Sequence, residues 1–435
     1  MLPAFRMWYH AGMKKLDHSR LCGLYKILMC SLFLLAVSPA GYRNIVETKF
    51  AVFSFLTGLF LLAFFVLFLR KKLPGGSWNI VQYLILAYWA WSLLSAACSP
   101  WKGIAFLGGE RCDGFITITL YCASFLLLSR YGDNTRFPTW ITAAALGVFC
   151  LVALLQFFDL NPLRLYPEPL RWSGREKAYN GAFLSLTGNA DLTACVLGTG
   201  FAFLWPLAIR KKSWLCGLIS LLCLAVLIAS GIRGGLLGAA ASVIFCLPAA
   251  LPLGRKGRRL SWAILALICI GILLVVYLAP MPGTGGELHA LLHGRAEDSF
   301  GSGRIYIWKK VWKLVRERPL LGGGPDTLGE RGLAFVKAAA DGSIIRRTID
   351  CAHCEPLNVL VNQGLPALLL LAGAMFLTLV RSVRRDSDAS VALHSALAAY
   401  LAASLFGIGM PANDAFFWLI WSSLLRETAK ENGNH

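Results

Sequence analysis

Charged residues are scarce in this sequence. Only 15% of its 435 residues are charged, whereas about a quarter are charged in a typical soluble domain. Acidic residues are the scarcer kind, with 23 Asp and Glu against 42 Lys and Arg. Hydrophobic residues instead make up 57% of the chain, and its mean hydropathy is +0.61. This balance excludes an ordinary soluble domain and indicates an integral membrane protein.

Internal repeats and low-complexity tracts are also absent, and the cysteines form no recognisable disulfide framework. Most of the 13 cysteines lie inside apolar runs, where they are most simply small buried hydrophobic residues. No charged residue is expected well inside a span, and the sequence shows no outward carboxylate cluster suited to Mg²⁺. We therefore expect a helical membrane protein without a metal or other cofactor.

Apolar runs of about 18 or more residues recur along the chain and end in Arg and Lys clusters, which predicts membrane helices. Because only helices or closed barrels satisfy the backbone in lipid, we expect residues 1–435 to form one all-α bundle. The first of the twelve predicted spans resembles a signal peptide with a cleavage site at 38–40, but the alternation of the others favours a retained anchor. The predicted spans are about 25–40, 48–69, 78–98, 114–130, 137–158, 189–209, 213–230, 234–253, 259–280, 356–380, 388–407 and 413–426.

The basic clusters predict how the bundle is oriented in the membrane. Those at 70–72, 210–212, 255–259 and 381–385 all fall on the same side when the spans alternate. Since short cytoplasmic loops carry an excess of Lys and Arg, we expect both termini in the cytoplasm. The net charge of +19 is then explained by anchors at helix ends, without nucleic acid as a partner.

One long polar segment, 281–355, is predicted to face outward before the tenth span. Within it, residues at about 304–318 place apolar side chains on one helical face and basic side chains on the other. This pattern predicts an amphipathic helix at the membrane interface, ended by the glycine-rich turn at 321–326. Shorter outward segments are expected at 100–113 and 159–190, the second of which should form a structured cover because it is rich in Pro, Arg and aromatic residues.

Three outward arginines have glycine neighbours and are candidates for binding an anionic group. Arg233 lies in Ser230-Gly-Ile-Arg-Gly-Gly235, Arg304 follows Gly301-Ser-Gly, and Arg111 lies in Gly108-Gly-Glu-Arg-Cys-Asp-Gly114. Glycine neighbours would let a large anion approach both the guanidinium and the backbone. The alternative for each is an interfacial arginine that only extends to water.

The loop ends on Asp350-Cys-Ala-His-Cys-Glu-Pro-Leu-Asn358, which contains His353. Cys351, His353 and Cys354 are possible zinc ligands. However, three ligands within four residues cannot readily surround one ion, and no second Cys/His pair lies nearby. A Cys351–Cys354 disulfide is favoured over zinc in an oxidising compartment. His353 is either catalytic or a solvated loop residue, whereas His394, inside a late span, is expected to be packed or hydrogen-bonded.

Taken together, these segments resemble the O-antigen ligase and polymerase family of bacterial envelope glycan assembly. With the twelve spans, the resemblance covers most of the chain. The sequence departs from the family's pattern at Cys354, where Asn is usual, and at Gln363, where an acidic residue is common. The matching segments, in the family's order, are Glu110-Arg-Cys-Asp-Gly114, Gly188-Asn-Ala-Asp191, Ser230-Gly-Ile-Arg-Gly-Gly235, Arg304-Ile-Tyr-Ile-Trp308 with Pro319-Leu-Leu-Gly-Gly-Gly324, and Ala352-His-Cys-Glu-Pro-Leu-Asn358 with Gln363-Gly-Leu-Pro366.

The resemblance implies a GT-C-like membrane glycosyltransferase of the bacterial inner membrane, with its active site at the outer mouth of the bundle. A glycan would move from a polyprenyl diphosphate, here undecaprenyl diphosphate, to a hydroxyl of a lipid, glycan or protein acceptor. Arg233, Arg304 and Arg111 would hold the departing diphosphate through bidentate hydrogen bonds. His353 would act as general base or bind a phosphate oxygen. A single displacement without a metal would invert the anomeric configuration.

Two alternatives remain open at this point. A repeat-unit polymerase of the same family would use the same leaving-group chemistry, so the sequence does not separate it from a ligase. A transporter of a lipid-linked glycan or a small anion would also have many spans and outward cations. Transporters, however, usually show intramembrane charges or helices broken in paired halves, and neither is seen in the sequence.

Overall fold

The computed structural model of the chain describes residues 17–132, 137–166, 183–279, 283–298, 300–338 and 344–430. Much of the predicted cover at 159–190 and the start of the predicted loop at 281 lie outside these residues. In the described parts, every predicted span coincides with a helix. The helices at these positions are α2 (His18–Leu28) continuing into the π-helix η1 (Met29–Phe33), α3 (Ile45–Leu69), α4 (Ile80–Ala97), α6 (Phe115–Tyr131), α7 (Thr139–Phe157), α8 (Ala190–Arg210), α9 (Trp214–Ser230), α10 (Arg233–Ala250), α11 (Arg255–Leu278), α14 (Glu355–Val383), α15 (Asp388–Ser404) and α16 (Pro411–Lys430).

Length and composition set the number of helices that can cross a membrane. Among the described residues, 7 helical segments are long and apolar enough to do so, while Phe115–Tyr131 and Trp214–Ser230 are apolar but shorter. The chain is thus a multi-pass helical membrane protein. That all twelve expected spans cross the membrane stays a prediction.

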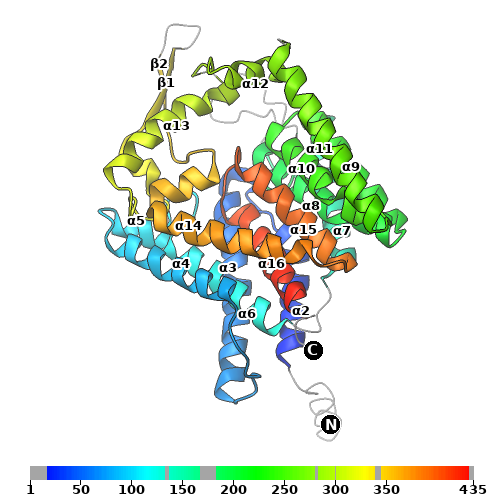
Figure 1. The fold of residues 1–435 in the computed structure, drawn as a ribbon. Helices are drawn as coiled ribbons and strands as arrows, with labels where there is room; N and C mark the ends of the chain where they lie inside the picture. Colours follow the sequence, from blue (N-terminus) through cyan, green and yellow to red (C-terminus); the bar gives the residue numbers. More distant parts are fainter. Residues whose placement is uncertain are drawn as a thin grey trace, which may run out of the picture.

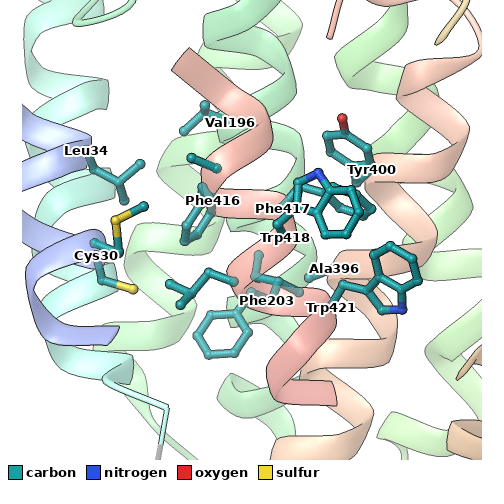
Figure 2. Packing of buried hydrophobic residues seen from close by; sticks show 14 of the residues in the cluster. Cys30, Leu34, Val196, Phe203, Ala396, Tyr400, Phe416, Phe417, Trp418 and Trp421 are labelled. Atoms are coloured by element: carbon teal, nitrogen blue, oxygen red, sulfur yellow. The ribbon is translucent and has the colours of Figure 1, made fainter. Parts of the chain in front are cut away.

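The centre of the bundle is built around α16, whose Phe416, Trp418 and Trp421 are almost fully buried (Figure 2). Helix α8 passes close by, and 83% of its most apolar stretch is buried inside the protein. Glycines let α10 approach its neighbours closely, because a Cβ at Gly235 would lie 2.7 Å from the Ala194 carbonyl oxygen. This packing fixes the position of the N-terminus of α10, where Arg233 lies.

The long loop forms a layer of its own beyond the ends of the helices. It contains α12 (Thr284–Leu292), α13 (Phe300–Glu317), the short 3₁₀ turn η4 (Leu328–Arg331) and a hairpin of β1 (Ala334–Ala338) and β2 (Ile344–Thr348). The hairpin is antiparallel and pairs Val336 with Arg346. It was not predicted from the sequence. Figure 1 shows α12, α13 and the hairpin at the end of the molecule opposite the start of α2 and the end of α16.

A kink in α14 anchors this layer to the bundle. Gly364 has φ +84°, and a Cβ there would lie 1.8 Å from the Leu320 carbonyl oxygen, so only glycine fits. The backbone groups freed by the kink are paired with the 319–324 segment: Gly324 N–H donates to the Asn362 carbonyl at 2.8 Å and Leu365 N–H to the Pro319 carbonyl at 2.8 Å. Two of the sequence segments that carry the family resemblance, 319–324 and 363–366, therefore pack against each other.

Candidate active site

His353 lies in the short segment between β2 and the start of α14. Its backbone adopts the left-handed conformation, with φ +49°, and its side chain is half-buried. The preceding residue, Ala352, is fully buried, and its carbonyl accepts a hydrogen bond from the indole nitrogen of Trp308 on α13 at 2.9 Å. Helix α13 therefore holds the histidine segment in place.

Arg304 lies in the first turn of α13 and reaches across to the loop after α15. One guanidinium nitrogen donates to the Gly301 carbonyl at 2.9 Å and another to the Phe406 carbonyl at 3.0 Å. Its Nε atom is buried without a hydrogen-bond partner in the described part of the chain. This guanidinium is thus oriented by protein carbonyls and keeps one donor unused.

Arg233 is the first residue of α10 and is paired with a carboxylate. Its side chain is 49% exposed and forms an ion pair with Glu287 of α12. A Cβ at the next residue, Gly234, would lie 3.9 Å from the Phe406 carbonyl oxygen, the atom that accepts the bond from Arg304. The start of α10 therefore packs near the end of α15, where the Phe406 carbonyl accepts from Arg304.

The glycines beside Arg233 have a different role from the one expected. They were predicted to admit a large anion, whereas Gly235 packs against Ala194 of α8, and Gly234 faces the backbone at Ala403 and Phe406. Only Gly231, which ends α9 in the left-handed conformation, has open space where its Cβ would be. Close helix packing, rather than ligand access, explains Gly235, whereas a Cβ at Gly234 would make only ordinary contacts.

The electrostatic surroundings of His353 favour its neutral form. Burial lowers the pKa of His353, and the positive charges of Arg304 and Arg111 lower it further. Asp191 at the start of α8 and Asp350 act in the opposite direction but do not cancel the effect. These effects favour the neutral imidazole, which is the form able to accept a proton. Asp191 was not predicted as a neighbour of this histidine.

Arg111 occupies a different environment from the other two arginines. Its side chain is buried, donates to the Gly409 carbonyl at 3.0 Å and lies 3.7 Å from the Asp350 carboxylate. Burial acts to lower the pKa of Arg111, but Cys351 and the surrounding carboxylates outweigh this and raise it above its ordinary value. The guanidinium is therefore enclosed by protein groups.

The loop between α15 and α16, residues 405–410, joins these groups. The Phe406 carbonyl accepts from Arg304 and the Gly409 carbonyl from Arg111, while the Gly409 N–H donates to Glu355 at 3.2 Å. Sequence reasoning missed this loop, although Gly407 and Gly409 just before Pro411 are a signal for a turn with exposed backbone groups.

Besides Asp350, four more carboxylates gather near Arg111, which the sequence did not predict. Asp326 accepts from the Gly109 N–H at 2.7 Å and from the Asp113 N–H at 3.2 Å. Burial, with the charges of Asp326 and Glu355, raises the pKa of Asp113 well above its usual range. The fourth carboxylate, Asp414, accepts from the Tyr400 hydroxyl. These residues come from four separate segments, which is why no local pattern reveals them.

The cysteines beside His353 are not bonded to each other. Cys351 is buried, Cys354 is half-buried, and both are free thiols. Burial raises the pKa of each thiol. Within the described ranges, no set of three or more His, Cys, Asp or Glu residues is arranged to hold a metal ion. His394, as expected, is a packed helix residue, with Nδ1 2.6 Å from the Ser382 hydroxyl.

Comparison with known families bears directly on this site. Residues 218–372 match the family model described as O-antigen ligase. The matched segment includes Arg233, Arg304 and His353, and it confirms the resemblance seen in the sequence. No curated protein matches the chain.

The O-antigen ligase match covers residues 218–372 and supports a general class of chemistry. It indicates a glycosyl-transferring membrane enzyme of the bacterial inner membrane, with a lipid-linked glycan and an acceptor as partners in general terms. The matched segment does not contain Arg111 or the loop 405–410. Both nevertheless contact residues within it, since Arg111 approaches Asp350 and Phe406 binds Arg304.

Proposed function

We propose that the protein is an O-antigen ligase-like glycosyltransferase. It moves a glycan from a polyprenyl diphosphate, such as undecaprenyl diphosphate, to an acceptor hydroxyl on the outer side of the membrane. The observation that supports this most directly is that Arg304, held by the Phe406 carbonyl, lies close enough to the half-buried His353 to help lower its pKa. Cationic donors for a leaving diphosphate and a base for an attacking hydroxyl are the two elements that this reaction needs.

The reaction is a single displacement at the anomeric carbon. The acceptor oxygen attacks that carbon, and a new glycosidic C–O bond forms while the C–O bond to the diphosphate breaks. The polyprenyl diphosphate leaves with the electron pair, and His353 takes the hydroxyl proton. Attack from the face opposite the leaving group inverts the anomeric configuration.

The leaving diphosphate is held by Arg304 and Arg233. Arg304 offers its unused Nε donor and is already oriented by the Gly301 and Phe406 carbonyls. Arg233 becomes available when the diphosphate displaces Glu287. Two guanidinium groups supply planar, charge-assisted donors to the oxygens on which charge develops. A metal ion is therefore not required for this step.

Arg111 acts on the site indirectly, through the loop 405–410 and His353. Because it is buried and bound to the Gly409 carbonyl, it fixes the loop 405–410 and lowers the pKa of His353 instead of touching the diphosphate.

A repeat-unit polymerase would use the same groups in the same way, since only the acceptor differs. We place the site on the extracytoplasmic side, with both termini in the cytoplasm, because the basic clusters lie at the opposite ends of the helices.

Reconstitution provides the test of this function. The purified full-length protein, in vesicles with a lipid-linked glycan donor and an acceptor, should release free polyprenyl diphosphate in step with glycosylated acceptor. In cells that lack the protein, the lipid-linked glycan should accumulate, as a finished chain for a ligase and as single units for a polymerase. Movement of intact donor across the membrane without release of diphosphate would instead identify a transporter.

A further inference from the structure

Helix α13 does not offer its apolar face to the membrane. An interfacial amphipathic helix usually buries that face in lipid, but Ile307, Val311 and Val315, which repeat every four residues along α13, are at most 8% exposed. They pack inside the protein, in a core shared with Leu328, Ile349, Ala352, Leu360 and Val361. The apolar face therefore attaches the long loop to the first half of α14, and the opposite face is left for other contacts.

The opposite face of α13 is basic. Lys313 and Arg316 are exposed on it, and Arg318 is exposed just after the helix ends. Among the described residues, none of these three cations forms an ion pair, whereas Lys309, one turn earlier, is paired with Asp298 at 2.6 Å. The end of α13 thus carries positive charge that no carboxylate of the described chain neutralises by direct contact.

Positive charge is also crowded around this end of the helix. Burial and the charge of Arg318 lower the pKa of the Arg331 guanidinium to about 10. Glu317, the one acidic residue of α13, acts in the opposite direction but does not cancel the effect. Two like charges close enough to shift a pKa disfavour each other, and an anion beside them relieves the repulsion. The end of α13 is therefore suited to an anionic group.

The chain leaves α13 along a helix that can cross the membrane. The Trp91 indole nitrogen donates to the Leu320 carbonyl at 3.3 Å, and the Ser95 hydroxyl donates to the Leu321 carbonyl at 2.6 Å. Trp91 and Ser95 lie in the last two turns of α4, which is long and apolar enough to span a bilayer. Residues 320–321 are therefore held at the level where such a span ends.

Apolar and basic side chains are both exposed at this level. Leu320 is 61% exposed and Trp312 is 46% exposed, while Lys313, Arg316 and Arg318 are exposed within a few residues of them. Tryptophan gathers at the boundary between water and lipid. Lysine and arginine can extend their charged ends to lipid phosphates while their aliphatic stems lie on apolar surface. The combination favours a bilayer over a soluble partner as the occupant of this surface.

We propose that the end of α13 binds the head groups of anionic phospholipids in the surrounding bilayer. Lys313, Arg316 and Arg318 donate hydrogen bonds to lipid phosphates, and Leu320 and Trp312 lie against the upper parts of the acyl chains. A cationic cluster beside a bilayer attracts lipids with a net negative charge in preference to zwitterionic ones. This binding needs neither a glycan donor nor an acceptor, so it does not depend on the proposed function.

Site-specific photo-crosslinking in lipid nanodiscs tests this binding. The full-length protein carries p-benzoylphenylalanine in place of Leu320, and the nanodiscs contain phosphatidylglycerol and phosphatidylcholine in equal amounts with identical acyl chains. Mass spectrometry identifies the attached lipid. We expect phosphatidylglycerol to be attached at least fivefold more often than phosphatidylcholine. With the probe in place of Leu274, a 53% exposed residue near the end of α11, the two lipids should be attached about equally. Equal ratios at the two positions would overturn the proposal.

Charge variants show whether the cations of α13 are responsible. The combined variant Lys313→Gln, Arg316→Gln and Arg318→Gln should bring the lipid ratio at the Leu320 position close to one. Arg316→Lys alone keeps the charge and should leave the ratio unchanged. An unchanged ratio in the combined variant would remove these cations from the site and overturn the proposal.

A matched control removes the same charge elsewhere. Arg255, Lys256 and Arg259 are exposed at the start of α11. Their combined replacement by glutamine should leave the ratio at the Leu320 position unchanged. An equal loss of preference in this control would show that overall charge, and not the end of α13, selects the lipid.

Two further measurements keep the test decisive. If the combined α13 variant loses its monodisperse elution, Arg318→Gln alone replaces it and should lower the ratio at least twofold. Sodium phosphate and sodium chloride of the same ionic strength should weaken the preference equally, because both only screen the charges. Loss of the preference in phosphate alone would show that the site takes a free phosphate group, which would overturn its assignment to the bilayer.

Discussion

Arg304 of α13 donates a hydrogen bond to the Phe406 carbonyl oxygen over 3.0 Å, although 102 residues separate them in the chain. The contact ties the outer layer to the end of α15 and sets the direction of the guanidinium. A positive charge held in advance stabilises a developing anion without the cost of reorganising at the moment of reaction. The proposed transfer activity should therefore depend on Arg304 and on the residues around it.

Arg304→Lys should lose most of the transfer activity even though the charge is kept. A lysine cannot both hold the Phe406 carbonyl and offer a second planar donor to the diphosphate. Loss of one preorganised donor typically costs about 3–4 kcal/mol, or roughly 10²–10³ in rate. The release of polyprenyl diphosphate measures it. Arg316→Lys, exposed on the same helix, is the matched control, and equal rates in the two variants would remove Arg304 from the site.

Glu287→Gln should increase the affinity for the donor. Glu287 pairs with Arg233 in the absence of donor, so the diphosphate has to displace it. Both side chains are partly exposed, and such pairs contribute about 0.2–1 kcal/mol, so we expect the donor KM to fall by up to roughly fivefold. Arg233→Lys should instead be badly impaired. A raised donor KM in Glu287→Gln would show that the ion pair supports binding.

The rate should depend on pH through His353. Because burial and the two arginines lower its pKa, the imidazole stays neutral to lower pH than an ordinary histidine, whose pKa is about 6.5. The rate should therefore hold through pH 7 and fall only as the pH drops below about 6.5. If His353 bound a phosphate oxygen as a cation, the rate would rise over that same range.

His353→Ala should reduce the transfer rate by about 10²–10⁴, the usual contribution of a positioned base, with donor affinity preserved. The residual activity should lose its acidic limb. His353→Asn serves as a second variant, because asparagine tolerates the left-handed backbone at this position better than alanine. If donor affinity falls while the rate at saturation is kept, His353 is a phosphate ligand.

Transfer should not require a divalent metal ion, because the proposed charge stabilisation comes from guanidinium groups. Purified protein assayed with lipid-linked donor in excess EDTA should keep most of its activity. Activity lost in EDTA and restored by Mg²⁺ or Mn²⁺ would contradict the arginine mechanism. Restoration by Zn²⁺ alone would point to Cys351, His353 and Cys354 as ligands.

The layer formed by the long loop, which contains α12, α13, η4 and the hairpin, should be accessible from outside the cell. In a background with Cys98 and Cys354 replaced by serine, Glu330→Cys should react with an impermeant thiol reagent on intact spheroplasts. Arg259→Cys, in the basic start of α11, should react only after lysis. The reverse pattern would invert the predicted topology.

The helices and part of the candidate site could be predicted from the sequence. The apolar runs located the helices because a membrane helix needs a continuous stretch of hydrophobic residues. Arg233, Arg304 and His353 stood out because charged and titratable residues are scarce in this chain. The structure brings their segments to one end of the bundle. The sequence could not show that Arg111 is enclosed, because its partners Gly409 and Asp350 lie hundreds of residues away.

The carboxylates and the hairpin were missed for different physical reasons. Only the packing of four segments brings together Asp113, Asp326, Glu355 and Asp414, of which Asp326 lies in the glycine-rich turn and the others near the starts of helices. The hairpin lies in a polar segment whose sequence shows no strong alternation of apolar and polar residues. The kink at Gly364 had a signal, since Gly-Leu-Pro interrupts an apolar run, but its partner segment at 319–324 did not.

The loop 405–410 also determines when the enzyme becomes competent during its synthesis. Arg111, Arg233, Arg304 and His353 all emerge from the ribosome before it. The carbonyls of Phe406 and Gly409, which hold two of these arginines, exist in place only once α15 and α16 have inserted. A nascent chain that has already released His353 from the ribosome therefore lacks the contacts that orient Arg111 and Arg304, and the proposed glycan transfer would begin only with the finished bundle.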